Sequence, residues 1–204
     1  MRRIQVAGMA LLFISCTGGM GSVTRSVTIH LEGAGGQMAY FDKYKNGLPY
    51  HVDSIKLDSD GNGVIPVPAL PLDFYRIAVG NEQLVVVLDS AESLAIEAQG
   101  GLLATPKRLE GSKHTDAMLS FQAESRGYDQ KVAALRAALA QDPANQANLD
   151  ELNATNTAYY ERCKQFVKEN QASPVAISAL GRLNLQQEFD LFKQTRDALR
   201  TTMG

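Results

Sequence analysis

The first sixteen residues hold the side chain with the clearest chemical use, the thiol of Cys16. Arg2 and Arg3 precede an apolar run over residues 4–14, and Ser15 separates that run from Cys16. A basic start, a short apolar core and a small residue at the cut are typical of a secretory signal. The run is too short to cross a bilayer, which takes roughly 20 residues. Residues 1–15 are therefore predicted to be a removable leader.

The cysteine at the cut makes this leader resemble a bacterial lipoprotein signal. The resemblance implies that Cys16 becomes the mature N-terminus and is lipidated, with residues 16–23 as a flexible tether. Several acyl chains hold a protein on a membrane where one would not. The expected location is the cell envelope, with the protein lipid-anchored at its periplasmic face. The alternative is an ordinary signal peptide cut elsewhere, with Cys16 incidental.

A second candidate for chemistry is the acidic motif Asp58-x-Asp60-x-Asn62-Gly63. It matches the first half of an EF-hand calcium loop, including the glycine at position six. The bidentate carboxylate that such a loop needs at position twelve is replaced by Ala69. Asp, Asn and Gly also tolerate the positive φ of a hairpin turn. We therefore expect a turn, with Asp58, Asp60 and Asn62 as weak candidates for calcium.

Other reactive side chains lack partners at a useful spacing. His51 and Asp53 would share a face of a strand, but no second pair at metal-ligand spacing follows. Cys163 falls on an apolar helical stripe, where a thiol packs as a small hydrophobe. The sequence has no Gly-x-Ser-x-Gly nucleophile elbow. We predict no catalytic residue, no metal and no cofactor in the chain as it stands.

Composition narrows the class of partner. The 204 residues are 45% hydrophobic with a net charge of −2, which is ordinary for a globular protein. A near-zero charge without a basic stripe argues against nucleic acid. Once Cys16 is acylated, Cys163 is the only thiol left, so neither an intramolecular disulfide nor a Cys-x-x-Cys motif can form.

Residues 24–110 show the alternation of β-strands. Apolar residues recur every second position in Ser26–Leu31 and in Tyr75–Val79, with Gly, Asn and Asp turns between such segments. Leu84–Leu88 is apolar on both faces, which predicts a central strand. Proline cannot donate to a sheet ladder, so Pro66, Pro68 and Pro71 predict an edge strand or loop. This half is predicted to be an antiparallel β-sandwich.

Residues 111–204 change to the helical rhythm. Two stripes repeat at 3-4 spacing on either side of Asp142-Pro143, which predicts a long antiparallel helical hairpin. Ser173-Pro174 starts a third helix with a cap and a proline at its first position. Phe189, Phe192 and Leu199 mark a fourth helix. Tyr159-Tyr160 and Phe189 with Phe192 could line a ligand groove, but such aromatics more often fill a helix–helix seam. The predicted fold class is α+β, with the sandwich followed by this helical region.

The order of these segments resembles the N-terminal accessory region of envelope-anchored, TlpA-like thiol:disulfide interchange proteins. The residues that carry the resemblance are Val52-Asp53-Ser54 with Asp58 and Gly63, Gly111-Ser112 before the first helix, and Asn170-x-x-Ser173-Pro174. In that family a β-sandwich and a helical segment precede a thioredoxin-like domain. The Trp-Cys-x-x-Cys of that domain is absent from this sequence. The resemblance therefore implies a location in the cell envelope and a domain architecture, and it implies no redox residue.

Three hypotheses follow. The first is a non-enzymatic envelope lipoprotein that binds or scaffolds, held on the membrane by acyl chains and docking an envelope protein partner. The second is the N-terminal half of a thiol:disulfide oxidoreductase without its thioredoxin-like domain. The third is a carbohydrate- or calcium-binding sandwich. An adjacent or in-frame Cys-x-x-Cys domain in the genomic sequence would separate the second from the first.

Overall fold

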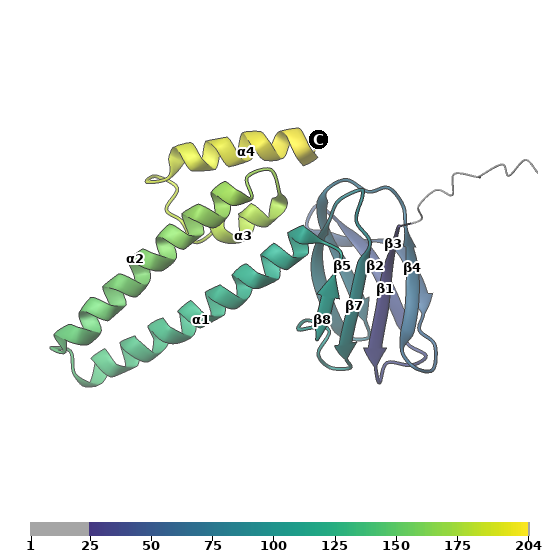
Figure 1. The fold of residues 1–204 in the computed structure, drawn as a ribbon, viewed down its shortest axis with the longest axis horizontal. Helices are drawn as coiled ribbons and strands as arrows, with labels where there is room; N and C mark the ends of the chain where they lie inside the picture. The colour runs from purple at the N-terminus through teal and green to yellow at the C-terminus, as the bar shows by residue number, and fades with distance from the viewer. Residues whose placement is uncertain (1–24, 204) are drawn as a thin grey trace, which may run out of the picture.

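A computed structural model describes residues 25–203, in which a β-sandwich is followed by helices (Figure 1). The strands are β1 (Arg25–Glu32), β2 (Met38–Lys45), β3 (Leu48–Lys56), β4 (Asn62–Val67), β5 (Asp73–Val79), β6 (Glu82–Leu88), β7 (Leu94–Gln99) and β8 (Arg108–Glu110). The helices are α1 (Lys113–Gln141), α2 (Gln146–Glu169), the short 3₁₀ helix η1 (Pro174–Ala176), α3 (Ile177–Leu180) and α4 (Phe189–Met203). The α+β fold class predicted from the sequence is confirmed.

The strands form two four-stranded sheets. One sheet has the order β4-β1-β7-β8 and the other the order β3-β2-β5-β6. The strand pairs are antiparallel except β1 and β7, which run parallel. Side chains of the alternating positions meet between the sheets, and Val27, Ile29, Phe41 and Ile77 are completely buried there. The period-two pattern of the sequence thus builds the inner faces of the sandwich.

Of two predictions about the positions of strands within the sheets, one is confirmed and one is wrong. β4 is an edge strand, as the proline within it, Pro66, predicts. β6 is also an edge strand, so the prediction that Leu84–Leu88 is central is wrong. The outer face of β6 is apolar for a different reason: Val87 is buried under the helices rather than between two strands.

The helical hairpin forms where the 3-4 stripes predict it. Ser112 accepts a hydrogen bond from Thr115 N and so caps α1, and Asn145 caps α2 by accepting from Asn148 N. Aromatic rings hold the two helices together: Tyr128 and Tyr159 stack with their centroids 3.8 Å apart, and Phe121 stacks on Phe166 at 4.3 Å. The long antiparallel hairpin projects from the sandwich (Figure 1).

The segment after the hairpin is less regular than the sequence indicates. Ser173 and Pro174 do begin a helix, but it consists of the 3₁₀ turn η1 and the four residues of α3. A second hydrophobic cluster joins this segment to α1, α2 and α4, and it extends onto the sandwich through Leu72, Phe74 and Val87. The helical region is therefore packed against the outer face of the β5–β6 edge.

Candidate functional site

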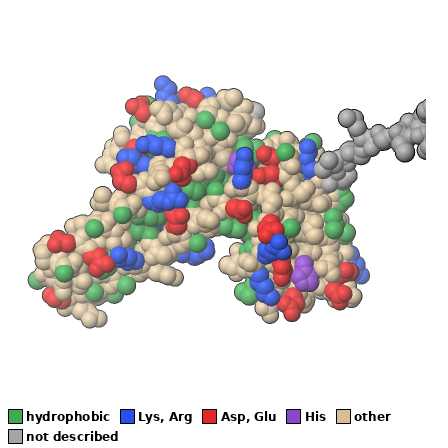
Figure 2. Space-filling model, viewed as in Figure 1, with side chains coloured by type: hydrophobic (Ala, Val, Ile, Leu, Met, Phe, Trp, Pro, Cys, Tyr) green, Lys and Arg blue, Asp and Glu red, His purple; other side chains and the backbone are tan. Residues whose placement is uncertain are grey.

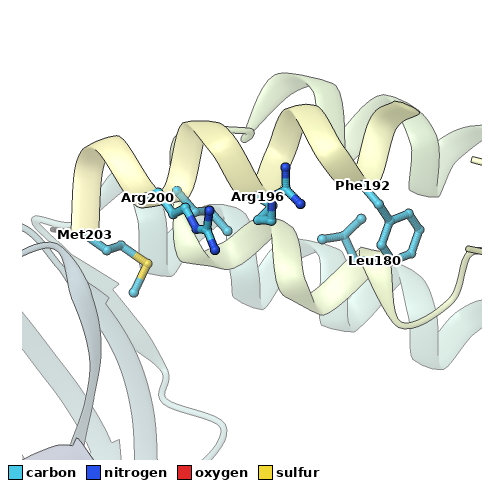
Figure 3. Close-up of a pocket in the computed structure, with 6 residues that line it drawn as sticks. Leu180, Phe192, Arg196, Arg200 and Met203 are labelled. Carbon is cyan, nitrogen blue, oxygen red and sulfur yellow. The ribbon is translucent and has the colours of Figure 1, made fainter. Parts of the chain in front are cut away.

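A concave surface of apolar character lies between α3 and α4 (Figure 3). It is an open groove of about 420 Å³. Its apolar side chains are Leu180 of α3 together with Phe192, Leu199 and Met203 of α4, and Arg196 and Arg200 complete the lining. In Figure 3, Leu180 and Phe192 face each other at one end, and Met203 lies at the end nearer the sandwich.

The helical periodicity of α4 explains why apolar and basic residues line the same groove. Leu191 and Thr195 are buried and face the hydrophobic cluster. A rotation of 100° per residue places Phe192, Leu199 and Met203 on an adjacent, partly exposed strip. Arg196 and Arg200, one turn apart, follow beside that strip, and Lys193 continues the same edge. We call Lys193, Arg196 and Arg200 the basic edge of α4.

The charges of the basic edge are weakly neutralised. Arg196 pairs with its sequence neighbour Asp197, with Arg196 Nη2 2.8 Å from Asp197 Oδ1 and both side chains more than half exposed. Neither Lys193 nor Arg200 forms an ion pair with another of residues 25–203. On the face seen in Figure 2 both signs of charge are interspersed, and hydrophobic side chains gather where helices and sandwich meet.

The sequence gives only a weak signal for this groove. It shows no basic stripe, and Phe189 and Phe192, which could line a groove, are expected to fill a helix–helix seam; of the two, only Phe192 lines the groove. Phe189 is in fact 61% exposed, and Phe192 and Leu199 are half-buried in the groove wall. The 3-4 spacing of Lys193, Arg196 and Arg200 beside the apolar positions is the signal that could have indicated an amphipathic surface.

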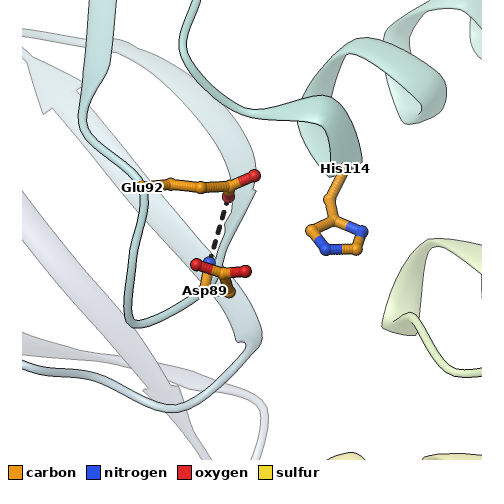
Figure 4. A group of neighbouring side chains, drawn as sticks. All are labelled: Asp89, Glu92 and His114. Atoms are coloured by element: carbon orange, nitrogen blue, oxygen red, sulfur yellow. Dashed lines mark hydrogen bonds between the residues drawn. The ribbon is translucent and has the colours of Figure 1, made fainter.

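A polar cluster lies where the sandwich meets α1. Asp89 and Glu92, in the turn between β6 and β7, converge with His114 in the first turn of α1 (Figure 4). One ligand atom from each of the three lies within 4.8 Å of the others, and all three side chains are half-buried. Among residues 25–203, this is the group of His, Cys, Asp and Glu side chains whose spacing suits a metal ion.

The hydrogen bonds of this cluster give it a structural role. Glu92 accepts from Asp89 N at 3.1 Å and from Lys113 N at 3.2 Å, so it binds the free amide at the start of α1. A carboxylate is stabilised at that end of a helix. Burial lowers the pKa of His114 and raises the pKa of Asp116 in the same turn. These contacts join the β6–β7 turn to α1 without requiring an ion.

The acidic motif of residues 58–63 forms a closed turn. Asp58 Oδ1 accepts from Asp60 N at 2.9 Å and from Asn62 N at 2.8 Å, and Asn62 Nδ2 donates to both carboxylate oxygens. These bonds lower the pKa of Asp58, and the bond from the backbone Asn62 N has the largest effect. Asn62 Oδ1 also lies 2.7 Å from His30 Nδ1. Asp58 and Asn62 are therefore engaged in the turn itself, whereas the Asp60 side chain is exposed.

The other residues noted in the sequence are separated by the fold. A β-bulge between Phe41 and Asp42 shifts the register, so that His51 pairs with Asp42, at 3.3 Å, instead of joining Asp53. The buried Asp42 carboxylate also accepts two bonds from Arg76, at 2.5 and 2.9 Å. Asp53 accepts from the neighbouring Ser54 N. This row of side chains stabilises sheet pairing across β3, β2 and β5.

Cys163 is completely buried in the helical cluster, as its place on the α2 stripe predicts. Burial raises the pKa of its thiol, and the hydrogen bond with Tyr159 opposes the shift. Cys16 lies outside the described residues. No helix within residues 25–203 combines the length and the apolar character needed to cross a membrane.

Comparisons with protein-family models, with curated proteins and with solved structures find no match to this chain. The groove offers an apolar surface with a weakly neutralised basic edge, which suits binding. In the polar cluster, Glu92 accepts from the backbone amides of Asp89 and Lys113, which suits a junction between the β6–β7 turn and α1.

Proposed function

We propose that this protein is a non-enzymatic, lipid-anchored binding module of the cell envelope, with the α3–α4 groove as its binding surface. Acyl chains on Cys16 tether it to the membrane at the periplasmic face. Its resemblance to the accessory region of TlpA-like thiol:disulfide interchange proteins supports this location. The resemblance also supports a role in docking a partner that carries the redox centre. The observation that carries the binding role is the open apolar groove of about 420 Å³ on the helical region.

Two physical features support binding at the groove. A concave, mostly apolar surface of this volume is typical of ligand-binding sites. Phe192, Leu199 and Met203 lie at one-turn or two-turn spacing along a rigid helix, so their positions are fixed before a ligand arrives. A preorganised surface loses less conformational entropy on binding. Cys163 is buried and carries no exchange chemistry in this proposal.

The groove is tested with 1-anilinonaphthalene-8-sulfonate, an apolar dye with one negative charge. We expect saturable binding with one dye per chain, and at least about tenfold weaker binding by Leu199→Gln. Leu185→Gln is the matched control, because Leu185 is an equally apolar side chain, 53% exposed, outside the groove lining. Equal dye binding by both variants would remove the groove as the binding surface.

The anchor is tested separately with Cys16→Ser. The variant should fold normally and leave the membrane fraction, because the acyl chains rather than the fold hold the protein there. Circular dichroism checks the fold, and fractionation after expression in a bacterial host checks the location. Retention of Cys16→Ser in the membrane fraction would contradict lipid anchoring and leave the groove experiment unaffected.

A further inference from the structure

The length and shape of the groove indicate which kind of ligand fits it. Its floor runs from Phe192 to Met203, which is about 16 Å or three turns along α4. Leu180 of α3 faces Phe192 at one end of this floor and makes that end concave. Elongated apolar grooves of this length take an amphipathic helix that places side chains at i, i+3, i+4 and i+7 into the floor.

The basic edge determines which helices fit. Arg196 and Arg200 are one turn apart, about 6 Å along the axis, and both line the groove. Lys193 lies on the same edge, three residues before Arg196. A helix lying in the groove would bring its own flank against these charges over successive turns. Acidic residues repeated at one-turn spacing on that flank would complement them.

Resting on the proposed function, we propose that the α3–α4 groove binds an amphipathic helix of a partner protein that carries Asp or Glu along one flank. The periodic charge decides between ligand classes. A fatty acid presents one negative group at one end, which matches one arginine and not a series. A membrane surface is flat and fits poorly against the concave end of the groove, where Leu180 faces Phe192.

The test uses the full chain and two fluorescein-labelled 14-residue helical peptides. Both carry leucine at i, i+3, i+4 and i+7; the first has glutamate along one flank, and the second has lysine at the same positions. Fluorescence anisotropy gives the Kd for each peptide. The acidic peptide should bind at least about tenfold more tightly than the basic one, and this ratio should shrink as salt is raised.

Charge reversal makes the test specific. In Arg196→Glu/Arg200→Glu the preference should invert, with the acidic peptide at least about tenfold weaker and the basic peptide tighter. Arg136→Glu is the matched control, because Arg136 is an exposed arginine of α1 without an ion pair among the described residues, and it should keep the wild-type ratio. Circular dichroism of each variant establishes that α4 is intact.

Each remaining outcome overturns one proposal or both. Equal Kd values for the two peptides, or an unchanged ratio in the double variant, would overturn the acidic partner while loss of binding in Leu199→Gln still supports the groove. Peptide binding unaffected by Leu199→Gln would overturn the groove as well. Binding to anionic phosphatidylglycerol vesicles that depends on Arg196 and Arg200, without peptide binding, would assign the surface to a membrane and overturn the proposal.

Discussion

Thr115 and Val87 exchange two hydrogen bonds. Thr115 Oγ1 accepts from Val87 N at 2.9 Å and donates to Val87 O at 2.8 Å, and both residues are completely buried. Val87 belongs to β6, an edge strand whose outer backbone groups have no neighbouring strand. The Thr115 side chain therefore acts as the missing neighbour and fixes the start of α1 on the sandwich. The groove depends on this junction for its placement beside the sandwich.

Thr115→Val should destabilise the protein by about 1–3 kcal/mol, because it keeps the shape of the side chain and removes the partner of the buried Val87 N–H. Val87 O retains a bond from Ser112 Oγ at 2.6 Å. Urea unfolding followed by circular dichroism measures the change. Thr157→Val on the exposed surface of α2 is the control, and a comparable loss there would contradict the assigned role of Thr115.

Gly61 should tolerate a side chain far less well than Gly36. Both have a positive φ, 83° and 79°, so Gly→Ala costs each of them about 1–2 kcal/mol of backbone strain. A Cβ at Gly61 would overlap the Leu31 carbonyl, whereas a Cβ at Gly36 meets nothing within 4 Å. Gly61→Ala should therefore lower the free energy of unfolding by about a further 1–3 kcal/mol. Equal losses in the two variants would show that Leu31 imposes no restriction.

Cys163 should resist alkylation in the folded protein and react once the chain is unfolded. Burial both blocks access and raises the pKa of the thiol, so the thiolate is scarce at neutral pH. Iodoacetamide labelling followed by mass spectrometry, with and without denaturant, measures this difference. Rapid labelling of the native protein would contradict the burial of Cys163 and reopen the question of a redox role.

The stability of the junction should fall in mild acid because of His114. Burial, with a smaller contribution from Lys113, lowers the pKa of His114 below 6.5 in the folded protein, against the opposing charges of Glu92 and Asp89. Between the lowered pKa and about 6.5 the unfolded chain binds the proton more readily. The free energy of unfolding therefore decreases as pH falls through this window.

His114→Gln should flatten that pH dependence, because the neutral side chain cannot take up the proton. Urea titrations at several pH values between 5 and 7.5 measure the slope. Thr157→Val on the exposed surface of α2 changes no titratable group and should keep the wild-type decline. An unchanged slope in His114→Gln would show that another group causes the dependence.

Local pattern was enough to predict the class of fold. Each strand or helix has one side that meets the core, and the spacing of apolar residues in the sequence shows which side it is. This spacing is the alternation in β1 and β5 and the 3-4 stripe in α1 and α2. The pattern could not say which layer supplies that core. Leu84–Leu88 reads as a central strand, yet β6 is an edge strand whose second face is buried by helices.

The candidate site was beyond the reach of sequence for a related reason. Phe192 and Leu199 have the spacing of core residues, and only the positions of α3 and α2 show that these side chains remain partly exposed. The Asp58–Asn62 turn was predictable, since its hydrogen bonds join residues at most four apart. The Asp89–Glu92–His114 cluster was not, because it joins two segments through the packing of α1 on the sandwich.

The most direct test of the groove as a binding surface is a titration of the isotopically labelled protein with the acidic peptide, followed by two-dimensional NMR. We predict that the largest chemical-shift changes fall on Leu180, Phe192, Leu199, Arg200 and Met203, with the sandwich unaffected. Changes confined to the sandwich, or no saturable change anywhere in the spectrum, would contradict it.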